Sequence, residues 1–251
     1  MSGRPLILVS NDDGYYADGI RAVAEALDAI GEVWVVAPER ERSATSHAIT
    51  LHKPLRVRKL AERRYWVSGT PTDCVYVAVN HILPRRPDLM VSGINAGANL
   101  GDDVTYSGTV GAAMEATLLD VPSIAASLTD IDEDGADYSG AAAVVVDLAR
   151  QVLERGLPDH VLLNVNVPNR YDPARGLRAT RLGRRHYGRE VELRQDPRGK
   201  KYVWIGGAIP VFIDTPGSDC NAAQERVASV TPVVVDTTAA GFVDSLAAWP
   251  G

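Results

Sequence analysis

Short apolar runs without polar alternation recur through the first two-thirds of the chain, and such runs are typical of buried strands in a parallel sheet. We expect core strands at residues 6–9, 33–36, 88–91, 124–128 and 161–167, with a short β excursion at 55–57 and 65–67. Segments with apolar residues on one helical face separate the core strands. We expect helices at residues 18–30, 70–83, 108–119 and 141–153. This alternation predicts an α/β fold with a parallel sheet covered by helices on both faces.

Polar residues mark the ends of two of these helices. Asp18 is expected to cap the first helix, and Gly31 is expected to end it. Thr70 is expected as the N-cap of the second helix, with Pro71 in the first turn and Asp73 completing a reciprocal pair of capping hydrogen bonds.

The chain changes character after residue 167. From residue 168 onward it is rich in Arg, Gly and Pro, with short β-like segments at 201–205 and 226–235. We therefore divide the chain into a core at residues 1–167 and a β-rich C-terminal extension at 168–251. Two arrangements of the extension stay open: arms that cross to a partner subunit, or a β subdomain packed on its own chain.

The composition is that of a globular protein with a sizeable core, since 45% of the 251 residues are hydrophobic and 23% are charged. A net charge of −6 argues against a nucleic-acid binder, which would carry a basic face. Cys74 and Cys220 lack metal-binding spacing and suit a reducing compartment, and Cys74 is expected in the core. With no signal region and no apolar run of membrane-spanning length, we expect a cytoplasmic protein without membrane contact.

Two adjacent carboxylates, Asp12 and Asp13, follow the first strand directly, and Gly14 permits a sharp turn after them. Like charges this close raise each other's pKa unless a cation neutralises them. A hard divalent metal, which prefers oxygen ligands, is the simplest such cation. The alternative is a solvated turn, because Asn, Asp and Gly are good turn formers.

Two further polar loops follow strands, at residues 42–47 and 92–103. Ligands of open parallel sheets bind beyond the carboxyl ends of strands, near the point where the strand order reverses. Carboxylates with neutral hydroxyl or amide oxygens suit Mg²⁺, Mn²⁺ or Ca²⁺. Ser107, Gly108 and Thr109 begin a helix, where N–H groups and hydroxyls favour an anion. A metal facing a phosphate site predicts phosphoryl chemistry.

Several familiar motifs are absent from the sequence. The glycine-rich 92–103 loop matches neither dinucleotide-binding nor P-loop spacing, and it lacks the P-loop lysine. No G-x-S-x-G nucleophile elbow is present. An aspartyl-phosphate mechanism stays open, although adjacent carboxylates that share one cation are more naturally ligands.

These motifs together resemble the bacterial and archaeal SurE (survival protein E) phosphatases, which are metal-dependent 5'/3'-nucleotidases. The matching segments cover nearly the whole chain: Ser10-Asn11-Asp12-Asp13-Gly14, Ala37-Pro38-Glu39-Arg40 with Arg42-Ser43, Gly69-Thr70-Pro71-Thr72-Asp73-Cys74, the 92–101 loop, Tyr106-Ser107-Gly108-Thr109-Val110 and Val230-Thr231-Pro232. One NDDG sequence is a weak signal, but these blocks in this order are very specific.

The resemblance implies a Rossmann-like doubly wound core and a β-rich C-terminal extension that exchanges between subunits of a homodimer or homotetramer. It also implies one divalent metal ion per subunit, most often Mg²⁺ or Mn²⁺. The implied substrates are nucleoside 5'- and 3'-monophosphates, with some activity on short polyphosphate. The segment at 181–203 has no motif that aligns, so base preference is not implied.

The family's metal ligands fall on Asp12, Asp13, Ser43 and Asn95, each identical in type here. Asn99 and the Ser107-Gly108-Thr109 segment match the phosphate-binding part of the family motif. The expected mechanism is hydrolysis by a metal-activated water, with Asn99, Ser107 and the helix N-terminus stabilising charge on the phosphoryl oxygens.

Alternatives stay open for individual residues and for the whole chain. Ser43 alone fits a plain loop serine, and Asn95 and Asn99 alone fit turn asparagines. His47 fits either a catalytic acid or a hydrogen-bonded loop histidine, and the pair at 102–103 fits either a second metal site or a capped loop. The alternative function is a nucleotide- or metal-binding regulatory protein with little turnover.

Overall fold

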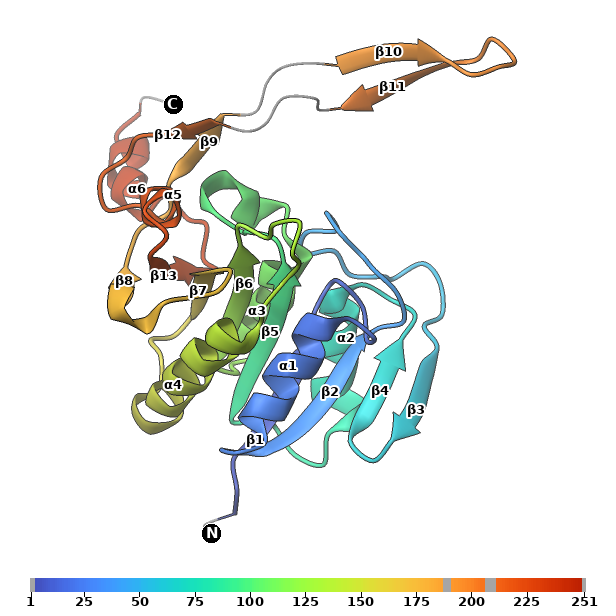
Figure 1. Ribbon diagram of the computed structural model, residues 1–251, viewed down its shortest axis with the longest axis vertical. Helices are drawn as coiled ribbons and strands as arrows, with labels where there is room; N and C mark the ends of the chain where they lie inside the picture. The colour runs from blue at the N-terminus through green and yellow to red at the C-terminus, as the bar shows by residue number, and fades with distance from the viewer. Residues whose placement is uncertain (1–2, 187–190, 206–210, 250–251) are drawn as a thin grey trace.

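The computed structural model describes residues 3–186, 191–205 and 211–249. Within this part of the chain, a nine-stranded sheet has the order β3-β4-β2-β1-β5-β6-β7-β13-β8 (Figure 1). Its parallel strands are β1 Leu6–Ser10, β2 Glu32–Pro38, β4 Arg64–Val67, β5 Leu89–Ala96, β6 Ser123–Thr129 and β7 Val161–Pro168. The chain goes from β1 outward to β2 and then returns to β5 on the other side, so the strand order reverses between β1 and β5.

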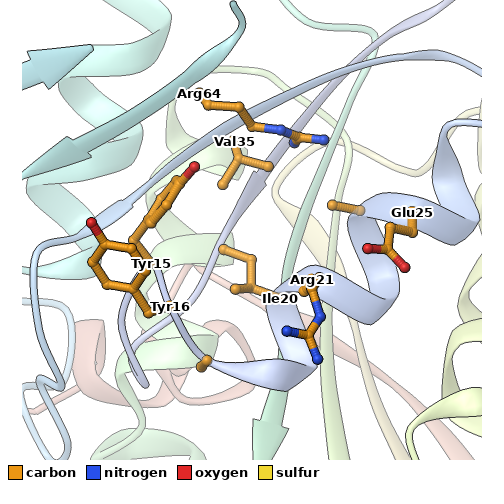
Figure 2. Close-up of a pocket in the computed structure, with 9 residues that line it drawn as sticks. Tyr15, Tyr16, Ile20, Arg21, Glu25, Val35 and Arg64 are labelled. Atoms are coloured by element: carbon orange, nitrogen blue, oxygen red, sulfur yellow. The ribbon is translucent and has the colours of Figure 1, made fainter. Parts of the chain in front are cut away.

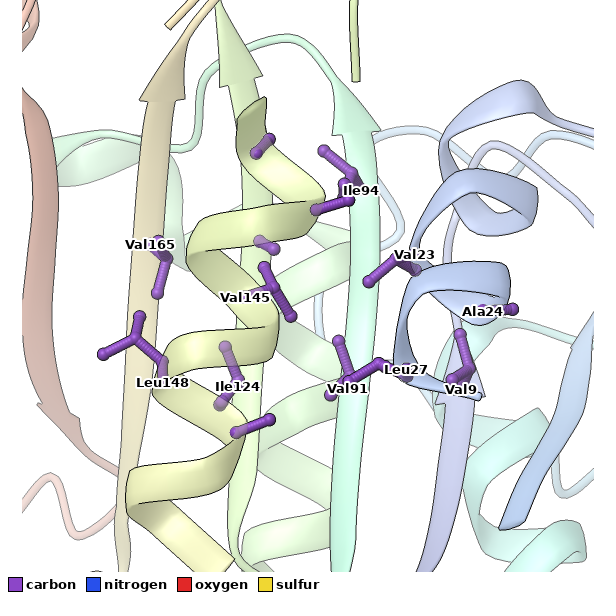
Figure 3. Close-up of a cluster of buried hydrophobic side chains, with 14 of the residues drawn as sticks. Val9, Val23, Ala24, Leu27, Val91, Ile94, Ile124, Val145, Leu148 and Val165 are labelled. Carbon is purple, nitrogen blue, oxygen red and sulfur yellow. The ribbon is translucent and has the colours of Figure 1, made fainter. Parts of the chain in front are cut away.

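Helices cover both faces of this sheet. Helices α1 (Asp18–Leu27) and α4 (Ser139–Arg155) lie on one face, and α2 (Pro71–Val77) and α3 (Gly108–Leu118) lie on the other (Figure 1). Under α1 and α4, side chains such as Leu27, Val145 and Ile124 form one buried cluster (Figure 3). A second cluster under α2 and α3 contains Leu8 and Cys74. The predicted doubly wound, mostly parallel Rossmann-like sheet is therefore confirmed, and Cys74 lies in the core.

The polar residues near the helix ends predicted one helix cap correctly and another wrongly. Thr70 caps α2, and its capping bonds with Asp73 form in both directions. The prediction that Asp18 caps α1 is wrong: Ala17 is the N-cap, and the exposed Asp18 side chain bonds to Arg21 at 2.7 Å. An ion pair with a residue one turn ahead has replaced the capping bond.

Other helix limits also differ from the sequence pattern. Helix α1 ends at Leu27 rather than at residue 30, and a π-helix, Ala78–Ile82, replaces the last turns expected of α2. Helix α4 begins at Ser139, two residues earlier than expected.

The C-terminal extension continues the sheet and adds separate hairpins. Strand β13 (Ala228–Val234) pairs antiparallel with β7, and β8 (Leu177–Ala179) follows it at the sheet edge, while β3 (Val57–Ala61) forms the opposite edge. Outside this sheet are β9 Arg184–His186, β10 Val191–Gln195, β11 Lys201–Ile205, β12 Val211–Ile213, α5 Asp219–Gln224 and α6 Ala240–Ala247. The β10–β11 hairpin projects away from the core (Figure 1). The predicted β-rich extension is therefore present, with two short helices that the sequence pattern did not indicate.

None of the helices in the described ranges combines the length and apolar character needed to cross a membrane.

Candidate active site

A pocket of about 730 Å³ lies at the carboxyl ends of β1 and β5, where the strand order reverses. It is lined by the predicted site residues Asp12, Asp13, Ser43, Asn95, Asn99 and Ser107, and also by Glu41, Ala44, Ala96, Ala98, Asp103, Tyr106 and Ile205. Six predicted residues from four separate segments thus meet in one place. Sheet topology brings them together, because the strands that precede the acidic turn and the glycine-rich loop are neighbours.

A second pocket, of about 270 Å³, lies beside α1 (Figure 2). Its lining includes Tyr15 and Tyr16, whose rings meet edge to face at 5.0 Å, together with Arg21 and Arg64. The residues that line it include none of the predicted metal- or phosphate-binding residues, so the candidate active site is the larger pocket.

Asp12 is almost fully buried at the base of the larger pocket, with 5% of its surface exposed. Burial raises the pKa of its carboxyl group to about 6; the hydroxyl of Thr109 donates to Oδ1 and opposes this shift, while the neighbouring Asp13 adds to it. Folding therefore holds a carboxylate where its charge is poorly solvated.

Asp13 joins the acidic turn to the end of β5. The backbone N–H of Ala96 donates to Asp13 Oδ2 at 3.0 Å. Burial raises the pKa of Asp13, this hydrogen bond lowers it, and the negative charge of Glu41 raises it further. Gly14 turns the chain sharply at φ +99°, and a Cβ there would lie 2.9 Å from the carbonyl carbon of Arg40. The turn therefore needs a glycine, as the sequence suggested.

The neutral oxygen donors of the pocket, Ser43 and Asn95, come from two separate segments. Ser43 is on the loop after β2, and its hydroxyl donates to Glu41 Oε1 at 2.7 Å. The N–H of Arg42 donates to the backbone oxygen of Asp12 at 2.7 Å, which holds this loop against the acidic turn. Asn95 donates its Nδ2 to the oxygen of Gly97 at 2.7 Å, which leaves the amide oxygen as its group for a ligand.

Asn99 is fixed by two asparagines of β7. The side-chain oxygen of Asn166 accepts from the backbone N–H of Asn99 at 2.9 Å. The side-chain amides of Asn164 and Asn166 both donate to the backbone oxygen of Asn99. The Nδ2 of Asn99 donates to Ser127 at 2.7 Å. Sequence reasoning did not single out these two β7 residues. Their signal was available: two asparagines at alternate positions on one side of an otherwise apolar strand need polar partners in the core.

The N-terminus of α3 faces the same pocket. Ser107 is the N-cap, and its oxygen accepts from the N–H of Val110 at 3.1 Å, which leaves its hydroxyl proton for another acceptor. Gly108 lies against Asp12, and a Cβ there would be 2.8 Å from the Asp12 Cβ. The hydroxyl of Thr109, which the sequence placed beside the anion, is instead hydrogen-bonded to Asp12.

The remaining polar candidates have protein partners. His47 Nε2 lies 2.7 Å from Glu115 Oε2, and His47 is not among the residues that line the pocket. Asp103 lines the pocket and forms an ion pair with Arg185 of β9, and Asp102 Oδ2 accepts from the Arg185 N–H at 3.2 Å. Through these two contacts with Arg185, Asp102 and Asp103 attach the C-terminal extension to the glycine-rich loop.

The pocket's donor set fits a hard divalent cation better than zinc. Within the described residues, no three His, Cys, Asp or Glu side chains converge in a group that could hold a metal ion. The set comprises two carboxylates with hydroxyl and amide oxygens, which is the donor type that Mg²⁺ and Mn²⁺ prefer. A cation would also offset the poorly solvated charge of Asp12.

Comparison with known proteins places the chain in a family. The model of the family "Survival protein SurE" matches residues 7–189. The chain is 52% identical over 252 residues to 5'-nucleotidase SurE of Myxococcus xanthus, covering 99% of this chain and 95% of the relative. It is 55% identical to 5'-nucleotidase SurE of Anaeromyxobacter dehalogenans strain 2CP-C over 97% of this chain and 95% of the relative.

A solved structure agrees with this placement. The crystal structure of the SurE protein from Aquifex aeolicus is similar with a TM-score of 0.84 and 40% sequence identity, covering 96% of this chain and 98% of that one. The chain belongs to the survival protein SurE family.

Proposed function

We propose that this protein is a metal-dependent phosphomonoesterase that hydrolyses nucleoside 5'- and 3'-monophosphates to nucleoside and phosphate. The observation that carries the proposal is that one pocket combines a hard-oxygen donor set with the N-terminus of α3. The names of the two relatives, 5'-nucleotidase SurE, support the nucleotide substrate. Hydrolysis of short-chain polyphosphate belongs to the same proposal, because polyphosphate presents similar phosphoryl oxygens.

Asp12, Asp13, Ser43 and Asn95 are the residues that would hold one Mg²⁺ or Mn²⁺ ion per subunit. When bound, such an ion polarises phosphoryl oxygens and lowers the pKa of a water molecule. Thr109 orients Asp12 through its hydrogen bond, and the Ala96 N–H orients Asp13. These two hydrogen bonds hold the carboxylates in place before a ligand binds.

Asn99 and the N-terminus of α3 would supply the hydrogen-bond donors for the phosphoryl group. Ser107 can donate its hydroxyl proton because its oxygen already serves the helix cap. The helix N-terminus at Gly108 and Thr109 favours negative charge. Asn99 is held by the β7 asparagines at the edge of the pocket. We assign these groups to the stabilisation of charge that develops on the phosphoryl oxygens.

We also propose that the protein forms a homodimer or homotetramer through its extension. In the β10–β11 hairpin, Val191 pairs with Ile205 and Leu193 with Val203, so four exposed apolar side chains share one face. A hairpin this short is marginal alone, and exposed apolar patches mark interfaces. A second copy of the chain is the partner that we propose for this face.

Phosphate release from AMP tests the proposed activity. We expect Mg²⁺ or Mn²⁺ to support release, EDTA to abolish it, and either ion to restore it after the chelator is removed. Full activity after exhaustive chelation would overturn the metal mechanism. Stoichiometric nucleotide binding without phosphate release would favour the regulatory alternative. A trapped covalent phospho-enzyme would favour an aspartyl-phosphate route.

A further inference from the structure

The loop at residues 42–47 carries Ser43 and needs external support. Ala44 and Ser46 have positive φ values of 56° and 53°. Residues other than glycine in this left-handed region each cost on the order of 1 kcal/mol, and such conformations persist only where the surroundings hold them. Regular secondary structure does not supply that support, because residues 42–47 lie in no helix or strand.

Helix α3 supplies part of the support through two glycines on one face. A Cβ at Gly108 would lie 3.1 Å from Thr45 Oγ1, and a Cβ at Gly111 would lie 2.6 Å from the Ser46 oxygen. Positions 108, 111 and 115 share one side of a helix. The loop therefore lies directly on the helix backbone at the first two positions.

The third position on this face of α3 carries Glu115, which is buried with 8% of its surface exposed. His47, at the end of the loop, contacts it at 2.7 Å. A buried carboxylate needs a partner, and His47 provides one. The same side chain that satisfies Glu115 thus fastens the loop to α3, the helix whose N-terminus faces the pocket.

We propose that His47 is a positioning residue: through Glu115 it holds the 42–47 loop on α3 and so sets the place of Ser43 at the metal site. This inference rests on the proposed function, because it assumes that Ser43 is a ligand. His47 does not line the pocket, so it would act through Glu115 and the loop. Removing a residue that orients a metal ligand typically weakens metal affinity by about 10- to 100-fold.

Calorimetric titration of Mn²⁺ into the metal-free protein, prepared with a chelator that is then removed, tests the positioning role of His47 without relying on activity. We expect His47→Ala to weaken Mn²⁺ binding by about 10-fold. His47→Gln, whose amide can reach Glu115, is expected to retain affinity to within about 3-fold. The matched control is His52→Ala, which changes an exposed histidine outside the pocket and should bind as the wild type does. In phosphate-release assays, His47→Ala should need more Mn²⁺ but approach wild-type kcat at saturation.

A second variant tests the same contact from the helix side. Gly111→Ala favours the helix locally by about 1 kcal/mol, but its methyl group would displace the Ser46 backbone. Because the substitution favours the helix, we expect the variant to fold even if His47→Ala does not. Because it displaces the loop that carries Ser43, we expect it to bind Mn²⁺ more weakly.

The outcomes separate the two proposals. If the wild type binds Mn²⁺ and both His47→Ala and Gly111→Ala bind it equally well, the positioning role is wrong and the proposed function stands. An equal loss of affinity in His47→Gln and His47→Ala would also contradict the role of the His47–Glu115 contact. If the wild type binds no Mn²⁺, the proposed metal site is wrong, and the positioning role is wrong with it.

Discussion

At the scale of single residues, the site places Asp12 where its charge is least stable. An aspartate in water has a pKa of about 3.9, whereas burial raises that of Asp12 to about 6. A carboxyl group with a raised pKa stabilises the folded state only while it is protonated. In the metal-free protein this contribution is present at about pH 4 and is lost as the pH rises to about 6.

Asp12→Asn should therefore raise the melting temperature of the metal-free protein at pH 7.5, by an amount equivalent to on the order of 3 kcal/mol at most. The difference from wild type should nearly vanish at pH 4. Melting curves in EDTA at both pH values measure it, with the exposed Asp147→Asn as the control. With Mn²⁺ present, turnover of Asp12→Asn should fall at least about 100-fold. Parallel stability profiles for mutant and wild type would contradict the burial argument.

Ser107 has two roles that a matched control can separate. Ser107→Ala removes the N-cap of α3, which should cost about 1 kcal/mol of stability. It also removes a donor to the phosphoryl group, which should lower kcat by about 10- to 100-fold with little change in KM. Ser218→Ala removes a comparable cap from α5 without touching the pocket. Steady-state kinetics on AMP should show the loss in the first variant alone; equal kcat values in both would place the anion site elsewhere.

At the scale of secondary-structure elements, the site depends on strands that carry none of the proposed ligands. Strand β7 lies two strands from β5, yet Asn164 and Asn166 reach the backbone oxygen of Asn99. The extension is fastened in the same region, because Asp219 of α5 accepts from the N–H of Gly101 at 2.9 Å. The glycine-rich loop is therefore held from β7 and from α5.

Asn166→Ala should leave the Asn99 N–H buried without its acceptor. We expect a loss of about 1–3 kcal/mol in the free energy of unfolding, as for other buried groups that lose a partner. Turnover should fall as well, because Asn99 would no longer be held at the pocket. Urea unfolding and phosphate release measure the two effects, with the exposed Asn80→Ala as the control. Destabilisation with unchanged kcat would show that Asn99 does not need this support.

At the scale of the whole molecule, the β10–β11 hairpin projects away from the core (Figure 1). One face of the hairpin exposes Val191, Leu193, Val203 and Ile205. Ile205 also lines the candidate active site. An interface on the hairpin would therefore lie close to the pocket.

Leu193→Lys combined with Val203→Lys should reduce the molecular mass measured by light scattering to that of a smaller assembly, because two charges would be buried in the proposed interface. Arg194→Ala changes the opposite face of the same strand and should leave the mass unchanged. A wild-type protein that is monomeric, or a double variant with unchanged mass, would contradict assembly through this face.

Local sequence patterns predicted much of the fold. Apolar runs and helical periodicity predicted the α/β core, and the Thr70–Asp73 capping bonds formed because they involve residues three positions apart. The same reasoning was wrong at Asp18, where two local partners compete and Arg21 prevails over the helix N–H groups. Sequence signals are therefore most dependable where one local interaction has no competitor.

The sequence by itself also determined which residue types supply the site chemistry, and the pocket contains six of the eight residues predicted for it. Their roles, the division of the chain at residue 167 and the assembly state remain predictions. Only the tertiary structure decided that Thr109 serves Asp12, 97 positions away, and that Asn166 holds Asn99, 67 positions away. Such contacts depend on the order and register of the strands. The hydrophobic pattern of a single segment does not specify either, because it reflects only the burial and periodicity of that segment.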